Sequence, residues 1–265
     1  MLLSIAVPVV QVLTESMPIS SSGHVELLLC WWFGNNHFYV PSIKALYHLV
    51  HGLNAGIVIF YLRHHVRATI VSLAKGHIDP RIWVTWAATL ITAILYIFVR
   101  SYIQCVPLPI GFSITVILLA FSRYLPGWPD RQYRWQDGVV LGLCQAIALI
   151  PGVSRFAVTV TTAQLIHLSP QQAFTISLYL QAPMMLGATI LGIIQYSRLS
   201  ASAVEEIAWW HSDAAWIGVV SMIVAVCCSF ALLMFAQKLI VTRRLYYCAW
   251  YECGLLAASL IGLCI

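Results

Sequence analysis

The stretch VVLGLCQAIALIPGVSRFAVT, residues 139–159, starts as an apolar helix too short to cross a membrane. Its first twelve residues would extend only about 18 Å as a helix, against the ~30 Å of a bilayer's hydrocarbon core. Pro151 then ends the helix, and a polar turn with one arginine follows. An unpaired arginine at the bilayer centre costs at least ~2.5–3.5 kcal/mol, so Arg155 needs an anionic partner or a polar cavity. The stretch therefore predicts a re-entrant hairpin with a buried polar tip.

The composition identifies lipid as the solvent of the whole fold. Hydrophobic residues make up 61% of the 265 residues and charged residues 9%, which is typical of an all-α polytopic membrane protein. The net charge of +5 would suggest nucleic acid in a soluble protein. Here we expect no nucleic-acid partner, because the positions of the basic residues matter more than their sum. The eight cysteines lack metal-ligand spacing and are expected to act as small hydrophobic residues.

Six further apolar segments are long enough to predict membrane-spanning helices. They lie near residues 41–62, 83–105, 109–124, 172–196, 214–237 and 245–264. Alternating these spans across the membrane separates the 14 lysines and arginines very unequally. One side receives Arg63, Arg67, Lys75, Arg81, Arg123, Arg131, Arg134, Lys238, Arg243 and Arg244, the other only Lys44, Arg100 and Arg198, with Arg155 at the tip. The basic excess predicts that the first side is cytoplasmic and that both termini lie outside.

A second half-length segment, Leu2–Leu13, breaks at Pro18 in the same way. Each hairpin is followed by three spans, an odd number, so the second hairpin should enter the membrane from the opposite face. We therefore predict one domain, residues 1–265, built as an inverted repeat of about 1–134 and about 135–265, with its site near the midplane. Three aligned pairs, each 134 residues apart, agree with this repeat: Gln11 with Gln145, Ile19 with Val153 and Ser20 with Ser154.

The first tip, QVLTESMPISSSGH, brings a carboxylate, a cluster of three serines after the proline and a histidine into one short segment. Glu15 follows Gln11 by four residues and shares its helix face. Serine hydroxyls, N–H groups at a helix start and a fixed arginine are the donors that a phosphate group needs. Two opposite charges at opposed tips predict that Glu15 and Arg155 meet at one site. A purely structural ion pair, with serines that only cap a helix, is the alternative.

The two tips together resemble the undecaprenyl-diphosphate phosphatase family, also called the bacitracin-resistance type. That family is marked by (E/Q)xxxE leading into PxSS(S/T)GH and by a second segment, PGxSRSxxT. Here these stand as Gln11-xxx-Glu15, PISSSGH at 18–24 and PGVSRFAVT at 151–159. The flanking segments QAIALIPG, QAPMMLGA and YYCAWYECGLL also agree, so the resemblance covers nearly the whole chain. Phe156 departs from it, because the family usually has serine there.

The resemblance implies an integral phosphatase of the bacterial cytoplasmic (inner) membrane. It would remove the terminal phosphate of undecaprenyl diphosphate and return the monophosphate carrier to cell-wall synthesis, at a site open to the periplasmic face. It also implies a divalent cation, Mg²⁺ or Ca²⁺, held by Glu15 with Gln11. The partners are a polyprenyl diphosphate lipid and the bilayer, with room for a homodimer.

The motifs place the expected roles on both tips. Attack on phosphorus falls to Ser21 or an activated water, and proton transfer to His24 and Glu15. The expected catalytic residues are Glu15, Ser21, His24 and Arg155, and the expected substrate-binding residues are Gln11, Ser20, Ser22, Gly23, Ser154 and Thr159.

Two rival functions remain open from the sequence. A lipid-phosphate transporter or flippase would also use an inverted repeat with broken helices, although it would not need Ser21, His24 and Glu15. A non-catalytic lipid-phosphate-binding member is suggested only by Phe156. Outside the tips, His48, His51 and Asn54 recur every three residues and predict a polar helix face lining the cavity, with metal ligation as the alternative. The pattern leaves the role of Glu252 open.

Overall fold

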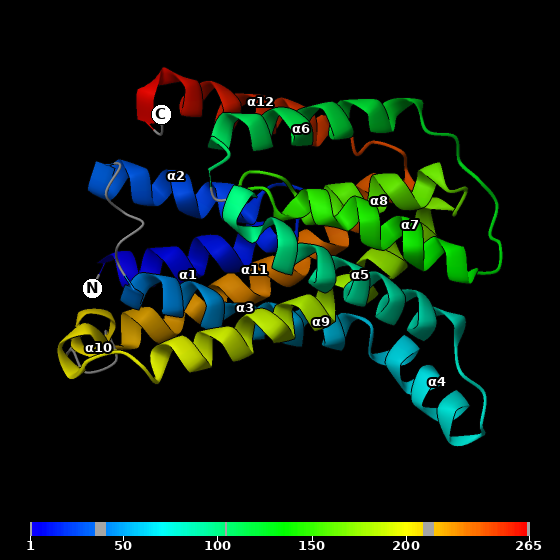
Figure 1. Cartoon of the computed structure of the whole chain (residues 1–265), viewed down its shortest axis with the longest axis horizontal. Helices are drawn as coiled ribbons and strands as arrows, with labels where there is room; N and C mark the ends of the chain where they lie inside the picture. Colours follow the sequence, from blue (N-terminus) through cyan, green and yellow to red (C-terminus); the bar gives the residue numbers. More distant parts are fainter. Residues whose placement is uncertain (1, 35–40, 104, 209–214, 264–265) are drawn as a thin grey trace.

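The computed structural model describes residues 2–34, 41–103, 105–208 and 215–263, and in these ranges every regular element is helical (Figure 1). Within these described ranges, four helices are long and apolar enough to cross a membrane: α3 (Pro41–Tyr61), α5 (Pro80–Ile103), α9 (Pro170–Tyr196) and α11 (Ala215–Val241). The predicted all-helical membrane-protein class is therefore confirmed. α6 (Leu108–Phe121) and α12 (Tyr247–Ala258) are shorter apolar helices, so the count of six spans stays a prediction.

Both predicted hairpins form. The first consists of α1 (Leu2–Glu15) and α2 (Ser21–Phe33), and the second of α7 (Trp135–Gln145), a 3₁₀ turn (Ala146–Leu149) and α8 (Arg155–Leu165). At each break a serine starts the second helix. Ser20 Oγ accepts the Gly23 N–H at 3.1 Å, and Ser154 Oγ accepts the Ala157 N–H at 3.2 Å. These N-caps satisfy N–H groups that would otherwise be left unpaired at the start of each second helix.

The second tip also needs glycine at two positions. Gly152 has φ +85°, and a Cβ there would lie 2.8 Å from the Leu108 carbonyl oxygen. A Cβ on Gly111 of α6 would lie 1.8 Å from the Pro151 carbonyl oxygen. The absence of side chains therefore lets the backbone of the tip press against α6.

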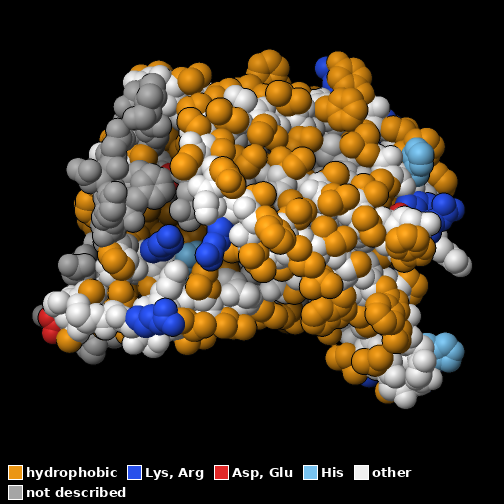
Figure 2. All heavy atoms as spheres, in the orientation of Figure 1, with side chains coloured by type: hydrophobic (Ala, Val, Ile, Leu, Met, Phe, Trp, Pro, Cys, Tyr) orange, Lys and Arg blue, Asp and Glu red, His pale blue; other side chains and the backbone are white. Residues whose placement is uncertain are grey.

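The hairpins lie between two helix pairs. α3 packs along α9, and α6 packs along α12. α1 contacts α3 and α8 contacts α9, whereas α2 and α8 both contact α6, so the two tips meet in the interior of the bundle (Figure 1). α4 (Arg63–Ala74) and α10 (Ala201–Ile207) extend the ends of this bundle. Figure 2 shows hydrophobic side chains over most of the visible face, and Trp86, Leu90 and Ile97 of α5 are each more than 60% exposed, as suits contact with lipid.

The expectation for the cysteines is wrong at one position. Cys30, buried near the end of α2, is disulfide-bonded. A disulfide joins residues by their distance in space, which the spacing of cysteines in an apolar sequence does not reveal. The other cysteines in the described ranges are free: Cys105, Cys144, Cys227, Cys228, Cys248 and Cys253.

Candidate active site

A polar cavity lies where the two tips meet. The first tip contributes Glu15, Ser21 and Ser22 to its wall, and the second contributes Ser154, Arg155 and Phe156. Tyr47 and His51 of α3 and Gln181 of α9 complete its polar lining. The two sequence motifs therefore predicted the tip residues of the cavity. The residues that α3 and α9 contribute lie outside these motifs and reach the cavity because the long helices pack around the tips.

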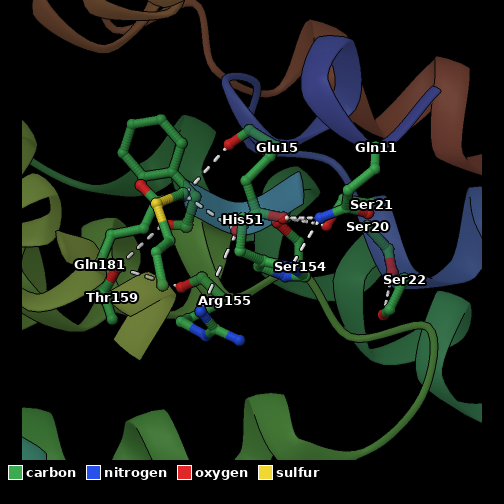
Figure 3. A network of polar contacts seen from close by, with 12 residues as sticks. Gln11, Glu15, Ser20, Ser21, Ser22, His51, Ser154, Arg155, Thr159 and Gln181 are labelled. Atoms are coloured by element: carbon green, nitrogen blue, oxygen red, sulfur yellow. Dashed lines mark hydrogen bonds and ion pairs between the residues drawn. The ribbon is translucent and has the colours of Figure 1, made fainter. Parts of the chain in front are cut away.

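Glu15 is the centre of the hydrogen-bond network in this cavity (Figure 3). Its Oε2 accepts a hydrogen bond from Gln11 Nε2 at 2.7 Å and another from the Ser21 hydroxyl. Its Oε1 accepts from Gln181 Nε2 at 3.2 Å and lies 4.0 Å from Arg155 Nη1. The prediction that the charges of the two tips meet is confirmed. The carboxylate is also placed to take a proton from Ser21.

One donor nitrogen of the Arg155 side chain has no hydrogen-bond partner among the described residues. Arg155 is the first residue of α8, so it stands at a helix N-terminus, and the first two residues of this helix line the cavity. Its Nη1 is buried and has no hydrogen-bond partner, and 4.0 Å from Glu15 is too long for a hydrogen bond. A buried guanidinium donor without a partner beside a helix N-terminus is suited to bind an anion such as phosphate.

The predicted serines divide into two kinds. Ser21 and Ser22 line the cavity, whereas Ser20 is 1% exposed and is held by the protein itself. The Ser20 N–H donates to Glu252 Oε1 at 2.7 Å, and its hydroxyl caps α2. On the second tip, Ser154 both caps α8 and lines the cavity. Ser20 therefore stabilises the conformation of the tip and does not face the cavity. Glu252, whose role the sequence left open, holds the tip by accepting the Ser20 N–H.

Two other predicted binding residues lie behind the cavity wall. A Cβ on Gly23 would lie 2.5 Å from the Phe112 ring, so this glycine allows α2 to pack closely on α6. Thr159 is 2% exposed, and its hydroxyl donates to the Arg155 carbonyl oxygen at 3.0 Å. The structure thus brings both residues near the site without placing them on the cavity surface.

The histidine beside the carboxylate is His51. His24 is engaged elsewhere, because its Nδ1 lies 2.5 Å from the Ser20 carbonyl oxygen and its Nε2 lies 2.8 Å from the Tyr251 hydroxyl. His51 Nε2 lies 3.2 Å from Gln11 Nε2 and faces the cavity. The predicted polar face of α3 therefore lines the cavity at His51. His48 on the same face bonds instead to Gln195 at 2.8 Å.

Phe156 stands where the family pattern has serine, and it does two things. Its ring packs against Phe174 of α9, with centroids 5.8 Å apart, and it forms part of the cavity wall. The residue is 3% exposed. At this point the chain thus has an apolar contact between α8 and α9 where a hydroxyl would offer a hydrogen bond.

The side chains at the site could bind a hard cation such as Mg²⁺ only if the substrate's phosphates supplied further oxygen ligands. The described residues contain no group of three or more His, Cys, Asp or Glu side chains that could hold a metal. However, Gln11 Oε1 is buried without a hydrogen-bond partner, two bonds from the amide nitrogen that contacts Glu15. Of these two residues only Glu15 lines the cavity, and one carboxylate beside an anion site matches the way Mg²⁺ is held by few carboxylates together with substrate phosphates.

The fold and the cavity define a class: a helical membrane protein whose two broken hairpins bring a carboxylate and an arginine together at a buried polar site. Residues 4–258 match the family model described as Bacitracin resistance protein BacA, and the chain belongs to this family. Among its relatives is the undecaprenyl-diphosphatase of Desulforudis audaxviator, 30% identical over 72% of this chain and 75% of the relative. The proteins of that name from Protochlamydia amoebophila and Thermotoga maritima are each 29% identical, over 75% and 70% of this chain and 76% of each relative.

Proposed function

We propose that this chain is an integral membrane phosphatase that hydrolyses undecaprenyl diphosphate to undecaprenyl phosphate and inorganic phosphate. The observation that carries the proposal is the direct hydrogen bond from the Ser21 hydroxyl to Glu15, with the unpartnered Arg155 donor across the cavity. It joins a nucleophile, a proton acceptor and an anion-binding group in one place. Family membership over residues 4–258 and relatives named undecaprenyl-diphosphatase support the same activity.

In the proposed reaction, Arg155 and the N-terminal N–H groups of α8 hold the phosphates. Glu15 takes the Ser21 proton as the Ser21 oxygen bonds to the terminal phosphorus, and the bond from phosphorus to the bridging oxygen breaks. The lipid monophosphate leaves, and water then releases inorganic phosphate from the serine. A water molecule held by Glu15 is the alternative nucleophile. Developing negative charge on phosphorus would be stabilised by donors already fixed in the cavity wall.

The proposed proton-transfer role of His24 requires a movement of its side chain. Both ring nitrogens are occupied, by Ser20 and Tyr251, and the ring stacks on Tyr251 with centroids 5.5 Å apart. We propose that Glu15 accepts the proton in the first step and that His24 transfers a proton only in a later step, after leaving these partners. The remaining predicted residues, Ser20, Gly23 and Thr159, act by holding the tips in shape.

A divalent cation, Mg²⁺ or Ca²⁺, would be held by Glu15 and by Gln11 Oε1 together with the substrate's phosphates. It would supply further neutralisation of phosphate charge. The residues of the chain would fix its position from the side opposite Arg155.

We further propose the predicted topology: six spans, with α6 and α12 completing the four long helices, two hairpins entering from opposite faces, and both termini outside the bacterial inner membrane. The Cys30 disulfide supports an oxidising environment at the end of α2, because disulfides persist outside the cytoplasm. The site would then open to the periplasmic face. A homodimer is compatible with this arrangement.

The decisive experiment measures phosphate release from undecaprenyl diphosphate by the purified protein in detergent, with and without EDTA. Ser21→Ala is the matched inactive control, because it removes one hydroxyl and preserves helix propensity. Release by the unmodified protein and loss in the control are expected. A transporter or a non-catalytic binding protein would bind the lipid and release no phosphate, and that outcome would end the phosphatase proposal.

A further inference from the structure

His51 reaches the site from α3, outside both sequence motifs. The residue is 4% exposed, and its Nδ1 lies 3.0 Å from the Tyr47 carbonyl oxygen. A carbonyl oxygen can only accept a hydrogen bond, so Nδ1 must carry the ring proton. In the neutral ring, Nε2 is then an acceptor, and it faces the Gln11 side chain. The backbone of α3 therefore fixes the tautomer of His51.

The Gln11 amide lies between this acceptor and the carboxylate of Glu15. Its Nε2 is 3.2 Å from His51 Nε2 and 2.7 Å from Glu15 Oε2, and an amide NH₂ group has two hydrogens for these two acceptors. The flipped amide would point its oxygen at two acceptors at once and lose both hydrogen bonds. His51 and Glu15 therefore both favour the same orientation of the Gln11 amide (Figure 3).

This orientation has a consequence on each side of the amide. Toward the cavity, it adds a second donor to the Glu15 oxygen that already accepts from Ser21, which holds that oxygen in line with the hydroxyl. At the other end, it leaves Gln11 Oε1 buried without a protein partner. Without the His51 acceptor, the amide would lose one of its two hydrogen bonds and could rotate, and Glu15 would then be held only by Ser21 and Gln181.

We propose that His51 is a positioning residue for the phosphatase reaction: as the Nδ1-protonated ring it orients the Gln11 amide and, through it, holds the Glu15 carboxylate toward Ser21. The inference rests on the proposed function and extends it to a residue on a third helix. It assigns no contact between His51 and substrate. Its effect should fall on turnover more than on the Michaelis constant, because the hydrogen bonds that hold the phosphate belong to other residues.

The test compares His51→Phe, which keeps an aromatic ring against Tyr47 but lacks the ring nitrogens, with His51→Gln, whose amide oxygen can accept from Gln11. We expect His51→Phe to lower kcat for phosphate release about 10- to 100-fold, with KM changed less than about threefold, the scale of a lost hydrogen bond in a charged network. His51→Gln should recover most of the lost turnover. His48→Leu is the matched control, one turn away on the same helix face but bonded to Gln195, and should leave turnover nearly unchanged.

A double-mutant cycle separates positioning from simple destabilisation. If His51 acts only through Gln11, the double variant His51→Phe, Gln11→Leu should be no slower than the slower single variant. Multiplying effects, wild-type turnover in His51→Phe, or no recovery in His51→Gln would each overturn the inference. If His51→Phe does not fold, as judged by thermal unfolding in detergent, His51→Leu takes its place. If the unmodified protein releases no phosphate, the proposed function is refuted, and the inference about His51 is refuted with it.

Discussion

Replacing Arg155 by alanine removes the only cationic side chain that lines the cavity in the described part of the chain. Its Nη1 donor has no protein partner and lies 4.0 Å from Glu15, so the guanidinium is free to make charged hydrogen bonds to phosphate oxygens. Two such bonds, at roughly 1.5–3 kcal/mol each, give about 3–6 kcal/mol. At about 1.4 kcal/mol per factor of ten, kcat/KM should fall about 10²- to 10⁴-fold.

Stability should respond much less to this change than activity. The Arg155 side chain is 26% exposed and its contact with Glu15 is long, so the ion pair contributes little to folding. The assay is phosphate release in detergent across substrate concentrations, with thermal unfolding measured on the same samples. Arg155→Lys is the matched control: it keeps the charge but lacks the planar fork that grips two oxygens, and it should restore activity only in part. Near-normal turnover by a folded Arg155→Ala protein at saturating substrate would show that the site has been assigned to the wrong residues.

Four further predictions test the chemistry and the topology. Ser21→Ala and Glu15→Gln should each lower turnover about 10²-fold or more, and the double variant should be scarcely slower than the worse single one because the two residues act as a unit; multiplying effects would argue against a shared step. His24→Ala should also lower turnover if His24 transfers a proton, and activity within about threefold of the unmodified protein would remove that role. EDTA should abolish phosphate release and Mg²⁺ or Ca²⁺ should restore it, whereas full activity in EDTA would exclude the proposed cation. A single cysteine at Gly127 should react with a membrane-impermeant thiol reagent only from the cytoplasmic side and one at Arg198 only from outside, so labelling of both from one side would refute the inverted topology.

The fold could be predicted where its causes are local in sequence. A twelve-residue apolar run followed by proline is too short to cross and must turn back, and both hairpins form where this rule places them. The meeting of Glu15 and Arg155 could also be predicted, because two isolated charges in a lipid-soluble bundle have few other partners. The same reasoning does not fix the kind of helix at the ends of these segments, because α6 continues as a 3₁₀ turn (Ser122–Tyr124) and α12 as a π-helix (Ser259–Leu263).

The choice of histidine shows where sequence reasoning fails. His24 is three residues from Ser21 and was the natural candidate, but on α2 that spacing turns the ring toward Ser20 and Tyr251. His51 is 40 residues from Gln11 and reaches it because α1 packs on α3. Which residue of a long helix faces the site depends on the rotation of that helix against its neighbours, and apolar packing around the helix decides it. A polar stripe in the sequence predicted the face but not the contact.

The two tips are supported in the same way, each by a side chain from a distant helix. The N–H of each capping serine is satisfied by a side chain from a distant helix: Ser20 donates to Glu252 of α12 at 2.7 Å, and Ser154 donates to Thr115 of α6 at 2.9 Å. Ser20 and α6 belong to the first proposed repeat, and Ser154 and α12 to the second. Each tip is therefore held by the last helix of the other repeat, and α6 packs against α12 between them. The proposed inverted repeat would produce such an exchange, because its two units would be related by a two-fold axis in the membrane plane. It also explains why neither tip could form a site alone: the hairpin that carries Glu15 is completed by α12, and the hairpin that carries Arg155 is completed by α6.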